Sequence, residues 1–527
     1  MPYQYIATGF YPAFATRVYV YTRFERNNVH KVQYEVLPNR SAYVRCPDRT
    51  IYITNPVRRW GCSPVDGIWD TVWEGDPFMN EWGEGFMPFA MISAHNGMNT
   101  QSGDGTSTGI RDRRWLKNGV RLFGDSGGSQ LKLGTTDYID PRSVLVWLNQ
   151  VADIGVPLDV APREVDRHYS KLFKALTHLQ TKHNAMFLSG ARGGTDEWGG
   201  LRLLNVAHGF TIDQIRKWAE TTYDDRFVGW AVGTDGSSRY QSLRAYMMCI
   251  KEFSSPTMTH HHLFGAANHT NAPAMAWLGR LAGERQTLSS DGTGWLDGVT
   301  YKRMRVPHLT GMVTAEHFGE KAALAKTAMP TAMSPCSCHV CSEIGGYYEV
   351  FNMPRCTPGP TLLMLHELYV TSRWHSMVSH LAYTATSLTE FLEWITSMFT
   401  RQSEKLPRIK QDHLSETLGM VRFVDLCWNE GPEVATREFR QHLGDDPQAG
   451  GSLPKLIKSG PTDVKRSTFD AIGFSLETAR TSTLPNYMTR KEMESFGLET
   501  KDVRPGMAEG NLPLSKATTG VAKVTRV

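Results

Sequence analysis

The sequence predicts an α/β protein built around an (α/β)8 TIM-type barrel, and two observations support this fold class. From about residue 86, short apolar runs that end in Gly, Asp or Ser alternate with longer amphipathic stretches. Strands that alternate with helices are typical of parallel sheets. The ends of the runs recur every 26 to 39 residues, and a repeat of about 30 residues over about 250 residues matches the size of such a barrel.

Seven apolar runs are the predicted strands of the barrel. Segments between them, such as PRSVLVWLNQVADIG and REVDRHYSKLFKALTHLQ, carry apolar residues at helical spacing. We expect the eighth strand in the Gly- and Ser-rich stretch between Ser93 and Gly119. The seven runs are FMPFAMIS (86–93), VRLFGDSGG (120–128), GVPLDVAP (155–162), NAMFLSGA (184–191), RFVGWAVG (226–233), THHHLFGAA (259–267) and RQTLSSDG (285–292).

Four segments are predicted along the 527 residues. Residues 1–85 are β-rich and aromatic, with strand-like runs such as RVYVYTRF at 17–24, and the barrel occupies 86–330. Residues 331–400 are predicted to hold a zinc-binding subdomain and closing helices, and 401–527 a polar C-terminal extension. Basic residues of the extension either bind phosphate groups of a partner or form a solvated surface; they are Lys455, Lys458, Lys465 and Arg466.

The composition excludes several classes of protein. Apolar residues make up 40% and charged residues 21% of the chain, as in ordinary globular proteins. The sequence has no apolar run of about 18 residues, so a membrane span is not predicted. Its first residues, MPYQYIATGF, have no basic stretch followed by an apolar one, so a secretion signal is not predicted either. We therefore expect a cytoplasmic protein. The net charge of +4 neither indicates nor excludes a nucleic-acid partner.

The clearest chemical signal is the run CSCHVC at 336–341 with a histidine 25 residues further on. Three thiolates and one imidazole form a closed tetrahedral site for a structural Zn²⁺, and clustered cysteines in a long chain indicate a reducing compartment. The predicted ligands are Cys336, Cys338, Cys341 and His366. His339, Cys356, His375 and His380 are alternatives for the fourth ligand, and unrelated buried cysteines are the alternative to a metal site.

Three carboxylates follow predicted strands, at Asp125, Asp159 and Asp291. The carboxyl ends of barrel strands meet at one rim, where active sites of such barrels lie. Three carboxylates at that rim indicate acid–base or nucleophilic chemistry, although Asp also caps helices that follow strands. In the strand run that contains HHH at 260–262, successive side chains face opposite ways, so the three histidines are predicted to pack or line a pocket rather than to share one ion.

The ordered motifs resemble those of the tRNA-guanine transglycosylases, a family of zinc-containing (α/β)8 barrels. GDSGGSQ at 124–130 resembles the DSGGxQ motif of that family, and the resemblance covers about residues 86–400. The other matching motifs follow in the family's order: PLDVAP (157–162), FVGWAVG (227–233), LFGAA (263–267), SSDGTGW (289–295), CSCHVC (336–341) and His366.

The resemblance implies a role for each matching residue. Asp291 matches the nucleophile that attacks C1′ of the target nucleoside, and Asp125 matches the acid–base residue at the incoming base. Asp159 matches the carboxylate that recognises the guanine edge. The strand end that contacts the base carbonyl matches Gly229, Trp230 and Ala231, and the residues that shape the pocket match Ser126, Gly127 and Gly128. Such an exchange conserves bond energy, so no nucleotide cofactor is expected.

Departures from the bacterial tRNA enzymes indicate a different polymer. SSDGTGWLDGVTYKRMR lacks the Cys and the PTR of the FDCVxPTR-like stretch that helps those enzymes to read the anticodon loop. The glutamine of their GxVQGG motif has no counterpart in FLSGARGG, where Ser189 or Arg192 is expected in its place. At these positions the sequence resembles instead the DNA-guanine transglycosylases called DpdA, which are encoded by phages and bacterial genomic islands.

The DNA-acting branch implies an enzyme that replaces guanine in DNA with a 7-deazaguanine such as preQ0, which protects the DNA from restriction. The implied partners are a free 7-deazaguanine base and DNA whose guanine is flipped out or single-stranded, and the sequence leaves a homodimer open. Exchange on tRNA and a non-catalytic nucleic-acid-binding paralogue are the alternatives. Four aromatic and basic residues near the rim are candidates for supporting DNA, although such residues more often form ordinary solvated surface; they are Trp295, Lys302, Arg303 and Arg305.

Overall fold

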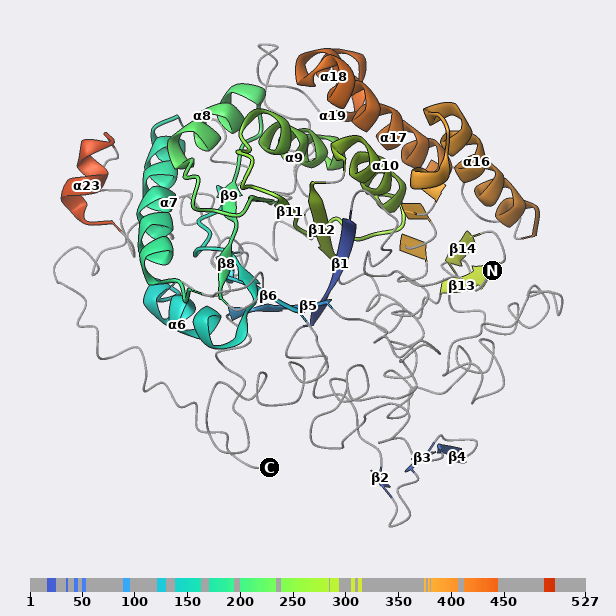
Figure 1. Cartoon of the computed structure of the whole chain (residues 1–527), viewed down its shortest axis with the longest axis horizontal. Helices are drawn as coiled ribbons and strands as arrows, with labels where there is room; N and C mark the ends of the chain where they lie inside the picture. The colour runs from blue at the N-terminus through green and yellow to red at the C-terminus, as the bar shows by residue number, and fades with distance from the viewer. Residues whose placement is uncertain are drawn as a thin grey trace, which may run out of the picture.

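The computed structural model describes the part of the chain that carries the predicted strand ends. The described residues are 17–24, 35–36, 42–45, 50–53, 89–94, 121–128, 138–162, 170–193, 200–233, 238–283, 285–292, 305–308, 311–314, 374–375, 378–379, 381–405, 412–443 and 488–497. The protein is an α/β protein whose main sheet is parallel (Figure 1).

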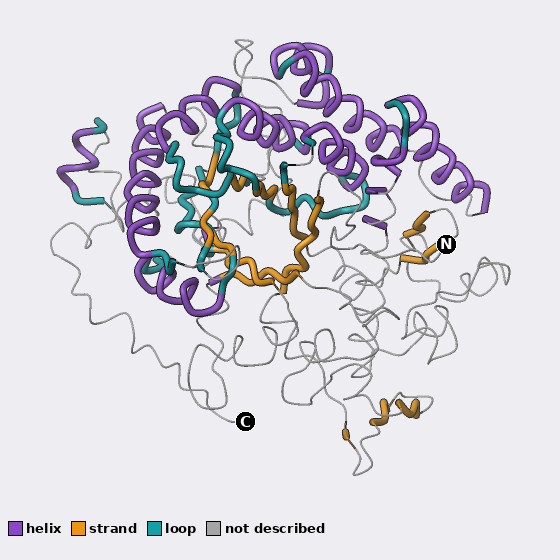
Figure 2. Tube along the Cα trace, in the orientation of Figure 1, coloured by secondary structure: helices purple, strands orange, loops and turns teal. Residues whose placement is uncertain are grey.

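Among the described residues, the main sheet has nine strands in the order β8-β7-β6-β5-β1-β12-β11-β10-β9. Every neighbouring pair in this order is parallel. Figure 2 shows the strands curving around a common centre, with helices outside them. The strands are β1 (Arg17–Phe24), β5 (Phe89–Ser93), β6 (Arg121–Asp125), β7 (Ile154–Gly155), β8 (Arg202–Leu203), β9 (Asn205–Ala207), β10 (Trp230–Val232), β11 (His260–Leu263) and β12 (Thr287–Gly292).

The two strands at the ends of this order, β8 and β9, are separated in the chain by Leu204 alone. The amide of Leu204 donates to the carbonyl of Gly155 after β7 (2.9 Å), and the amide of Asn205 donates to the carbonyl of Gly229 before β10 (2.8 Å). One stretch of six residues, 202–207, therefore bonds to a strand on each side.

One face of the sheet encloses an apolar cluster drawn from strands that are not all neighbours. Phe123 on β6 lies with its ring centroid 4.4 Å from that of His262 on β11, although three strands separate β6 from β11 in the sheet. The contact therefore crosses the inner face of the sheet. The cluster consists of Met91, Phe123, Ile154, Val156, Leu204, Val206 and Ala231.

The helices that follow the strands pack on the outer face and bury a second, larger apolar cluster. Residues next to the first turn of a helix fix where that helix begins. Asp140 caps the first of them and Pro141 occupies its first turn, and Thr211 and Gln214 form a capping box at the third. The helices are α6 (Pro141–Val151), α7 (Ser170–Gly190), α8 (Ile212–Thr222), α9 (Arg239–Glu252) and α10 (Ala272–Ala282).

In the part of the chain that the structure describes, five further helices lie toward the C-terminus: α16 (Leu388–Lys405), α17 (Asp412–Glu430), α18 (Pro432–Glu438), α19 (Arg440–Leu443) and α23 (Arg490–Ser495). Helix α17 packs against α9 and α10, and Asp425 on α17 accepts a 2.9 Å hydrogen bond from the indole of Trp277 on α10. Although 401–527 is predicted to be polar, α17 buries Met420, Val421, Phe423, Val424 and Cys427. None of the described helices is long and apolar enough to cross a membrane.

Two small antiparallel sheets complete the described structure. The strands β2 (Glu35–Val36), β3 (Ala42–Arg45) and β4 (Thr50–Ile53) form one of them, and β13 (Arg305–His308) pairs with β14 (Gly311–Thr314) in the other. They take no part in the main sheet.

The α/β class and most of the predicted strands are confirmed, and two of the predicted strand runs are wrong. Of the run 155–162, only Gly155 belongs to a strand, β7, and residues 156–162 are not in a strand. The run 184–191 belongs to helix α7, where the buried apolar residues Phe173, Leu176, Leu179 and Phe187 follow helical spacing. The strand at this point in the order is 202–207 instead. β1, predicted as a strand of the N-terminal segment, lies in the main sheet between β5 and β12. The stretch between Ser93 and Gly119, where the eighth strand is expected, lies outside the described residues except for Ala94.

Candidate active site at the carboxyl edge of the sheet

The three predicted carboxylates lie at the carboxyl ends of their strands. Asp125 is the last residue of β6, Asp291 is the penultimate residue of β12, and Asp159 follows β7 by four residues. Because all of these strands run parallel, their carboxyl ends share one edge of the sheet. Asp125 and Asp291 are 6% and 1% exposed, and buried carboxylates require hydrogen-bond partners.

Asp291 is held from the neighbouring strand. Its Oδ1 accepts a 2.6 Å hydrogen bond from the amide of Gly265, and lies 3.3 Å from His262 Nε2. Gly265 has φ +66°, a left-handed conformation that residues with a Cβ rarely adopt. The turn after β11 therefore needs a glycine to aim its amide at the carboxylate.

His262 connects Asp291 to the inner face of the sheet. Its Nδ1 lies 2.8 Å from Ser289 Oγ, and Ser289 and Asp291 share a face because they are two residues apart on β12. In the tautomer with its proton on Nε2, His262 donates to Asp291 and accepts from Ser289. Its ring contacts Phe123 and Phe264 at centroid distances of 4.4 and 4.7 Å.

The neighbouring histidines alternate as predicted for a strand. His260 Nε2 lies 3.2 Å from the same Ser289 Oγ that contacts His262. His261 faces the other way, where its Nδ1 accepts from the amide of Trp230 (3.2 Å) and its Nε2 contacts Gln286. Burial lowers the pKa of His261 to about 4, so this side chain is neutral at pH 7.

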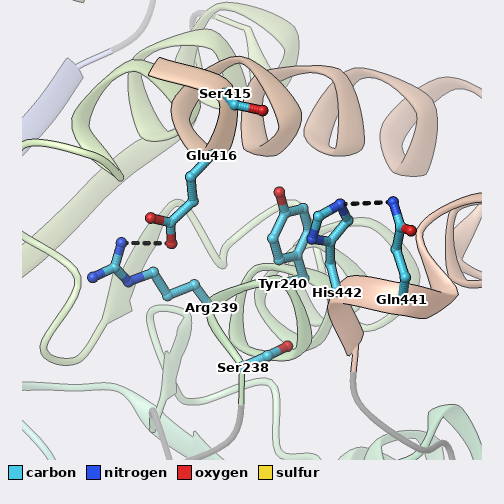
Figure 3. Close-up of a pocket in the computed structure, with 7 residues that line it drawn as sticks. All are labelled: Ser238, Arg239, Tyr240, Ser415, Glu416, Gln441 and His442. Atoms are coloured by element: carbon cyan, nitrogen blue, oxygen red, sulfur yellow. Dashed lines mark hydrogen bonds and ion pairs between the residues drawn. The ribbon is translucent and has the colours of Figure 1, made fainter. Parts of the chain in front are cut away.

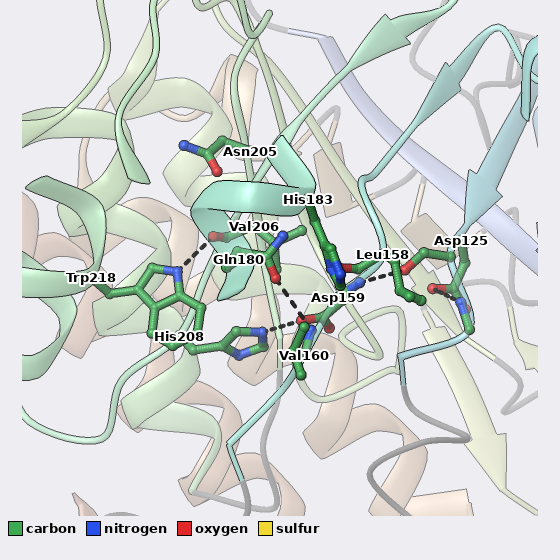
Figure 4. Close-up of polar contacts among 12 residues, drawn as sticks. Asp125, Leu158, Asp159, Val160, Gln180, His183, Asn205, Val206, His208 and Trp218 are labelled. Atoms are coloured by element: carbon green, nitrogen blue, oxygen red, sulfur yellow. Dashed lines mark hydrogen bonds and ion pairs between the residues drawn. The ribbon is translucent and has the colours of Figure 1, made fainter. Parts of the chain in front are cut away.

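The segment 125–128 packs against the loop that carries Asp159 (Figure 4). Asp125 Oδ1 accepts from the amide of Gly127 at 3.3 Å, and Ser126 Oγ accepts from the amide of Asp159 at 3.0 Å. A Cβ on Gly128 would lie 2.4 Å from the carbonyl oxygen of Asp159. The serine side chain and the close approach of Gly128 therefore hold the segment that carries Asp125 against the backbone of Asp159.

Asp159 itself forms a short contact with a residue that the sequence did not single out. Its Oδ1 lies 2.6 Å from Nε2 of His208, which follows β9 and has a fully buried side chain, whereas the Asp159 side chain is 14% exposed. His183 on α7 contacts the carbonyl of the preceding residue, Leu158, at 2.8 Å. Burial lowers the pKa of His183 to about 4, so its neutral ring donates this bond.

The predicted base-contacting strand end is built into the sheet. A Cβ on Gly229 would lie 1.7 Å from the carbonyl oxygen of His260, so only glycine allows the two strands this approach. The Trp230 indole packs in the outer layer and donates to the carbonyl of Phe253 (3.0 Å), whereas Ala231 belongs to the inner cluster. Contact of these residues with a base stays a prediction.

The predicted zinc ligands lie outside the described residues, as do three of the four alternatives for the fourth position. His375 is described and buried. Among the described residues, no group of three or more His, Cys, Asp or Glu could hold a metal ion. The residues outside the description are Cys336, Cys338, Cys341 and His366, with the alternatives His339, Cys356 and His380.

Ser189 and Arg192 are not at the carboxyl edge. They lie at the C-terminal end of α7, where the Arg192 amide donates to Asn149 Oδ1 on α6 (2.6 Å) and Ser189 Oγ donates to the carbonyl of Met186. The first polar residue after the strand 202–207 is His208. The sequence signal for it was the run LLNVAHG, which ends in glycine as the predicted strands do.

A separate pocket of about 700 Å³ lies where α17 and α19 meet the start of α9 (Figure 3). Within it, Arg239 pairs with Glu416 at 2.8 Å, and the Tyr240 ring stacks on that of His442 at a centroid distance of 4.9 Å. None of the three carboxylates lines it. Its lining residues are Ser238, Arg239, Tyr240, Ser415, Glu416, Gln441 and His442.

No protein-family model matches the chain, and the search of curated proteins finds no match. The functional interpretation therefore depends on the motifs of the sequence and the geometry of the carboxyl edge.

Proposed function

We propose that this chain is a DNA-guanine transglycosylase, a pentosyltransferase that exchanges guanine in DNA for a 7-deazaguanine base such as preQ0. The observation that carries the proposal is a chain of contacts at the carboxyl edge. Asp291 contacts His262, and the His262 ring packs on Phe123, two residues before Asp125 on the same face of β6. Two carboxylates that serve one sugar are what base exchange at C1′ requires.

We also propose that the parallel sheet closes into an (α/β)8 barrel. If β8 and β9 are counted as one strand interrupted at Leu204, that strand pairs with β7 on one side and with β10 on the other. The main sheet then has eight described strands, and its first and last strands are the same one. The inner cluster supports closure because Phe123 and His262 meet across it from strands that are not neighbours. In such barrels the active site lies at the carboxyl ends of the strands.

In the proposed reaction, Asp291 is the nucleophile. One of its carboxylate oxygens forms a bond to C1′ of the target nucleoside while the C1′–N9 bond breaks, and Asp125 gives its proton to the departing guanine. The incoming 7-deazaguanine gives the proton of its ring N9 position to Asp125, attacks C1′ and releases Asp291. Two displacements at one carbon retain the configuration of the sugar. The amide of Gly265 and His262 Nε2 hold Asp291 for the attack.

Asp159 is the proposed recognition residue. A carboxylate accepts two N–H groups at once, and guanine and preQ0 present a ring N–H beside an amino group. Ser126 Oγ accepts a hydrogen bond from the backbone amide of Asp159 (3.0 Å). This bond joins the recognition residue to the segment that carries the acid–base residue, so that base binding and proton transfer occur at one place.

The choice of DNA over tRNA depends on the sequence departures described above. A structural Zn²⁺ is proposed at Cys336, Cys338, Cys341 and His366 because of the CSCHVC run and the histidine that follows it. A target guanine in duplex DNA must leave the stack before Asp291 reaches C1′. We place the enzyme in the cytoplasm of a bacterial cell or of a phage-infected host, where the modified DNA resists restriction.

The test is an incubation of the full chain with preQ0 and, separately, duplex DNA, single-stranded DNA and unmodified tRNA. Each polymer is digested to nucleosides and analysed by mass spectrometry. We expect a 7-deazaguanine deoxynucleoside from DNA, and none with the Asp291→Asn variant. A modified ribonucleoside from tRNA alone assigns the enzyme to tRNA, and no product from any polymer refutes the proposal in favour of a non-catalytic protein.

A further inference from the structure

We propose that His208 is a positioning residue that sets the base specificity of the site, by holding Asp159 as an oriented carboxylate for bases with a ring N–H beside an amino group. The inference rests on the proposed function, because it concerns how the recognition carboxylate of that function is held. No motif of the sequence assigned a role to His208.

The His208 side chain is fixed on two sides. Its Nε2 lies 2.6 Å from Asp159 Oδ1, and its ring meets that of Trp218 edge to face at a centroid distance of 5.0 Å. Trp218 is itself anchored, since its indole donates a 2.9 Å hydrogen bond to the carbonyl of Val206 on β9. The strand that precedes His208 therefore also fixes the ring against which His208 packs.

The backbone around Asp159 is held from other elements (Figure 4). The amide of Asp159 donates to Ser126 Oγ (3.0 Å), the carbonyl of Leu158 accepts from His183 (2.8 Å), and the amide of Val160 donates to Gln180 Oε1 (3.2 Å). Each bond comes from a different side chain of the β6 loop or of α7. Because the backbone is held in this way, the hydrogen bond to His208 restricts the side-chain torsions of Asp159.

A buried polar chain continues behind this loop. Gln180 donates to Asn184, which donates to Asn205 Oδ1 (2.8 Å), and Asn205 donates to the carbonyl of Thr222 (2.7 Å). The amides therefore lock Gln180 into the orientation that presents its oxygen to Val160. Buried polar networks of this kind specify one arrangement of the groups they hold.

The orientation of the carboxylate determines which base it prefers. A fixed carboxylate accepts two parallel N–H bonds from guanine, whereas hypoxanthine lacks the amino group and makes one. A buried site built for a donor rejects ligands that lack it, because the acceptor is left unpaired. Without His208, the carboxylate can rotate and both bases meet a less ordered acceptor, so the preference for guanine falls.

The experiment measures equilibrium binding of guanine and of hypoxanthine to the full chain by isothermal titration, with thermal melting as the check on folding. The variants are His208→Leu, His208→Gln, and Asp159→Asn with and without a substitution at His208. The control is His178→Leu, an exposed histidine on α7. Base exchange at saturating preQ0 gives kcat, and its dependence on preQ0 concentration gives KM.

We expect His208→Leu to weaken guanine binding about 10- to 100-fold, the range for a lost hydrogen bond to a charged group, while hypoxanthine binding changes less than about threefold. KM for preQ0 rises with kcat nearly unchanged, because Asp159 takes no part in bond breaking. His208→Gln, whose amide N–H can donate to the same oxygen, restores most of the preference. In the Asp159→Asn background, His208→Leu has little further effect on the preference.

Two results separate this inference from the proposed function. If the unmodified protein binds neither base, the proposed function fails and the role of His208 fails with it. If the unmodified protein prefers guanine and His208→Leu retains the preference, or loses both bases equally without rescue by Gln, the inference alone is overturned. Should His208→Leu not fold, His208→Gln with and without Asp159→Asn still decides, since independent effects of the two substitutions on the preference contradict coupling.

Discussion

Acid should destabilise this protein through two buried neutral histidines. Burial lowers the pKa of His183 and of His261 from the ordinary 6.5 to about 4. The unfolded chain therefore takes up a proton at each site as the pH falls below about 6.5, whereas the folded chain does so only near pH 4. Stability is complete above the unfolded pKa and falls as the pH drops through the window from about 6.5 to about 4.

The size of the effect follows from the pKa difference. For one histidine with pKa values of 6.5 and about 4, the free energy of unfolding falls by about 2 kcal/mol between pH 7 and pH 5. Two independent sites give about 4 kcal/mol, a large part of the usual 5–15 kcal/mol of a folded domain. Desolvation of His260 lowers the pKa of that group too, and its contribution has the same sign.

The assay is urea unfolding at pH 7 and pH 5 for the unmodified chain and for His183→Gln and His261→Gln. Glutamine retains a donor but does not titrate, so each variant should lose about 2 kcal/mol of the difference between the two pH values, whatever its stability at pH 7. His178→Gln, at an exposed position on α7, controls for the removal of a histidine. If both His183→Gln and His261→Gln lose as much free energy of unfolding between pH 7 and pH 5 as the unmodified chain does, the assignment of neutral histidines is refuted.

Three further predictions concern the site and the metal. Asp291→Asn should abolish base exchange while guanine binding remains within about threefold, and exchange at the wild-type rate would contradict the role of nucleophile. Gly128→Ala places a Cβ 2.4 Å from the carbonyl oxygen of Asp159 and should cost about 1–3 kcal/mol, seen as a lower melting temperature and a higher KM for the base. A wild-type KM would show that the two loops move apart freely. Removal of zinc by a chelator should lower the melting temperature before it changes base preference, and a metal analysis that finds no zinc in the purified chain would exclude the site.

Prediction of the fold succeeded where one local pattern dominated. The runs at 120–128, 226–233, 259–267 and 285–292 each contain a strand because apolar and β-branched residues are followed by glycine or aspartate. The run at 184–191 was misassigned because a short apolar run has the same composition in a buried strand and in a buried helix. Its place in α7 is decided by the helical spacing that begins at Phe173.

For the site too, the sequence predicted the features that depend on a local pattern and missed those that depend on contacts between distant segments. Asp125, Asp159 and Asp291 could be selected from the sequence because each follows a strand-like run or belongs to a recognisable motif. The partners of these carboxylates could not, because they come from other strands. His262 reaches Asp291 from β11, and His208 reaches Asp159 from the end of β9, 49 residues further along the chain.

The sequence by itself determined the α/β class, the carboxyl-edge position of the three aspartates and the glycines that let strands and loops approach closely, since these depend on residues near one another in the chain. Only the tertiary structure decided which histidine meets which carboxylate, that β1 lies between β5 and β12, and that α17 buries its apolar face. The physical reason is that strand order and register bring together side chains from distant segments, and hydrogen bonds between such side chains leave no periodic trace in the sequence.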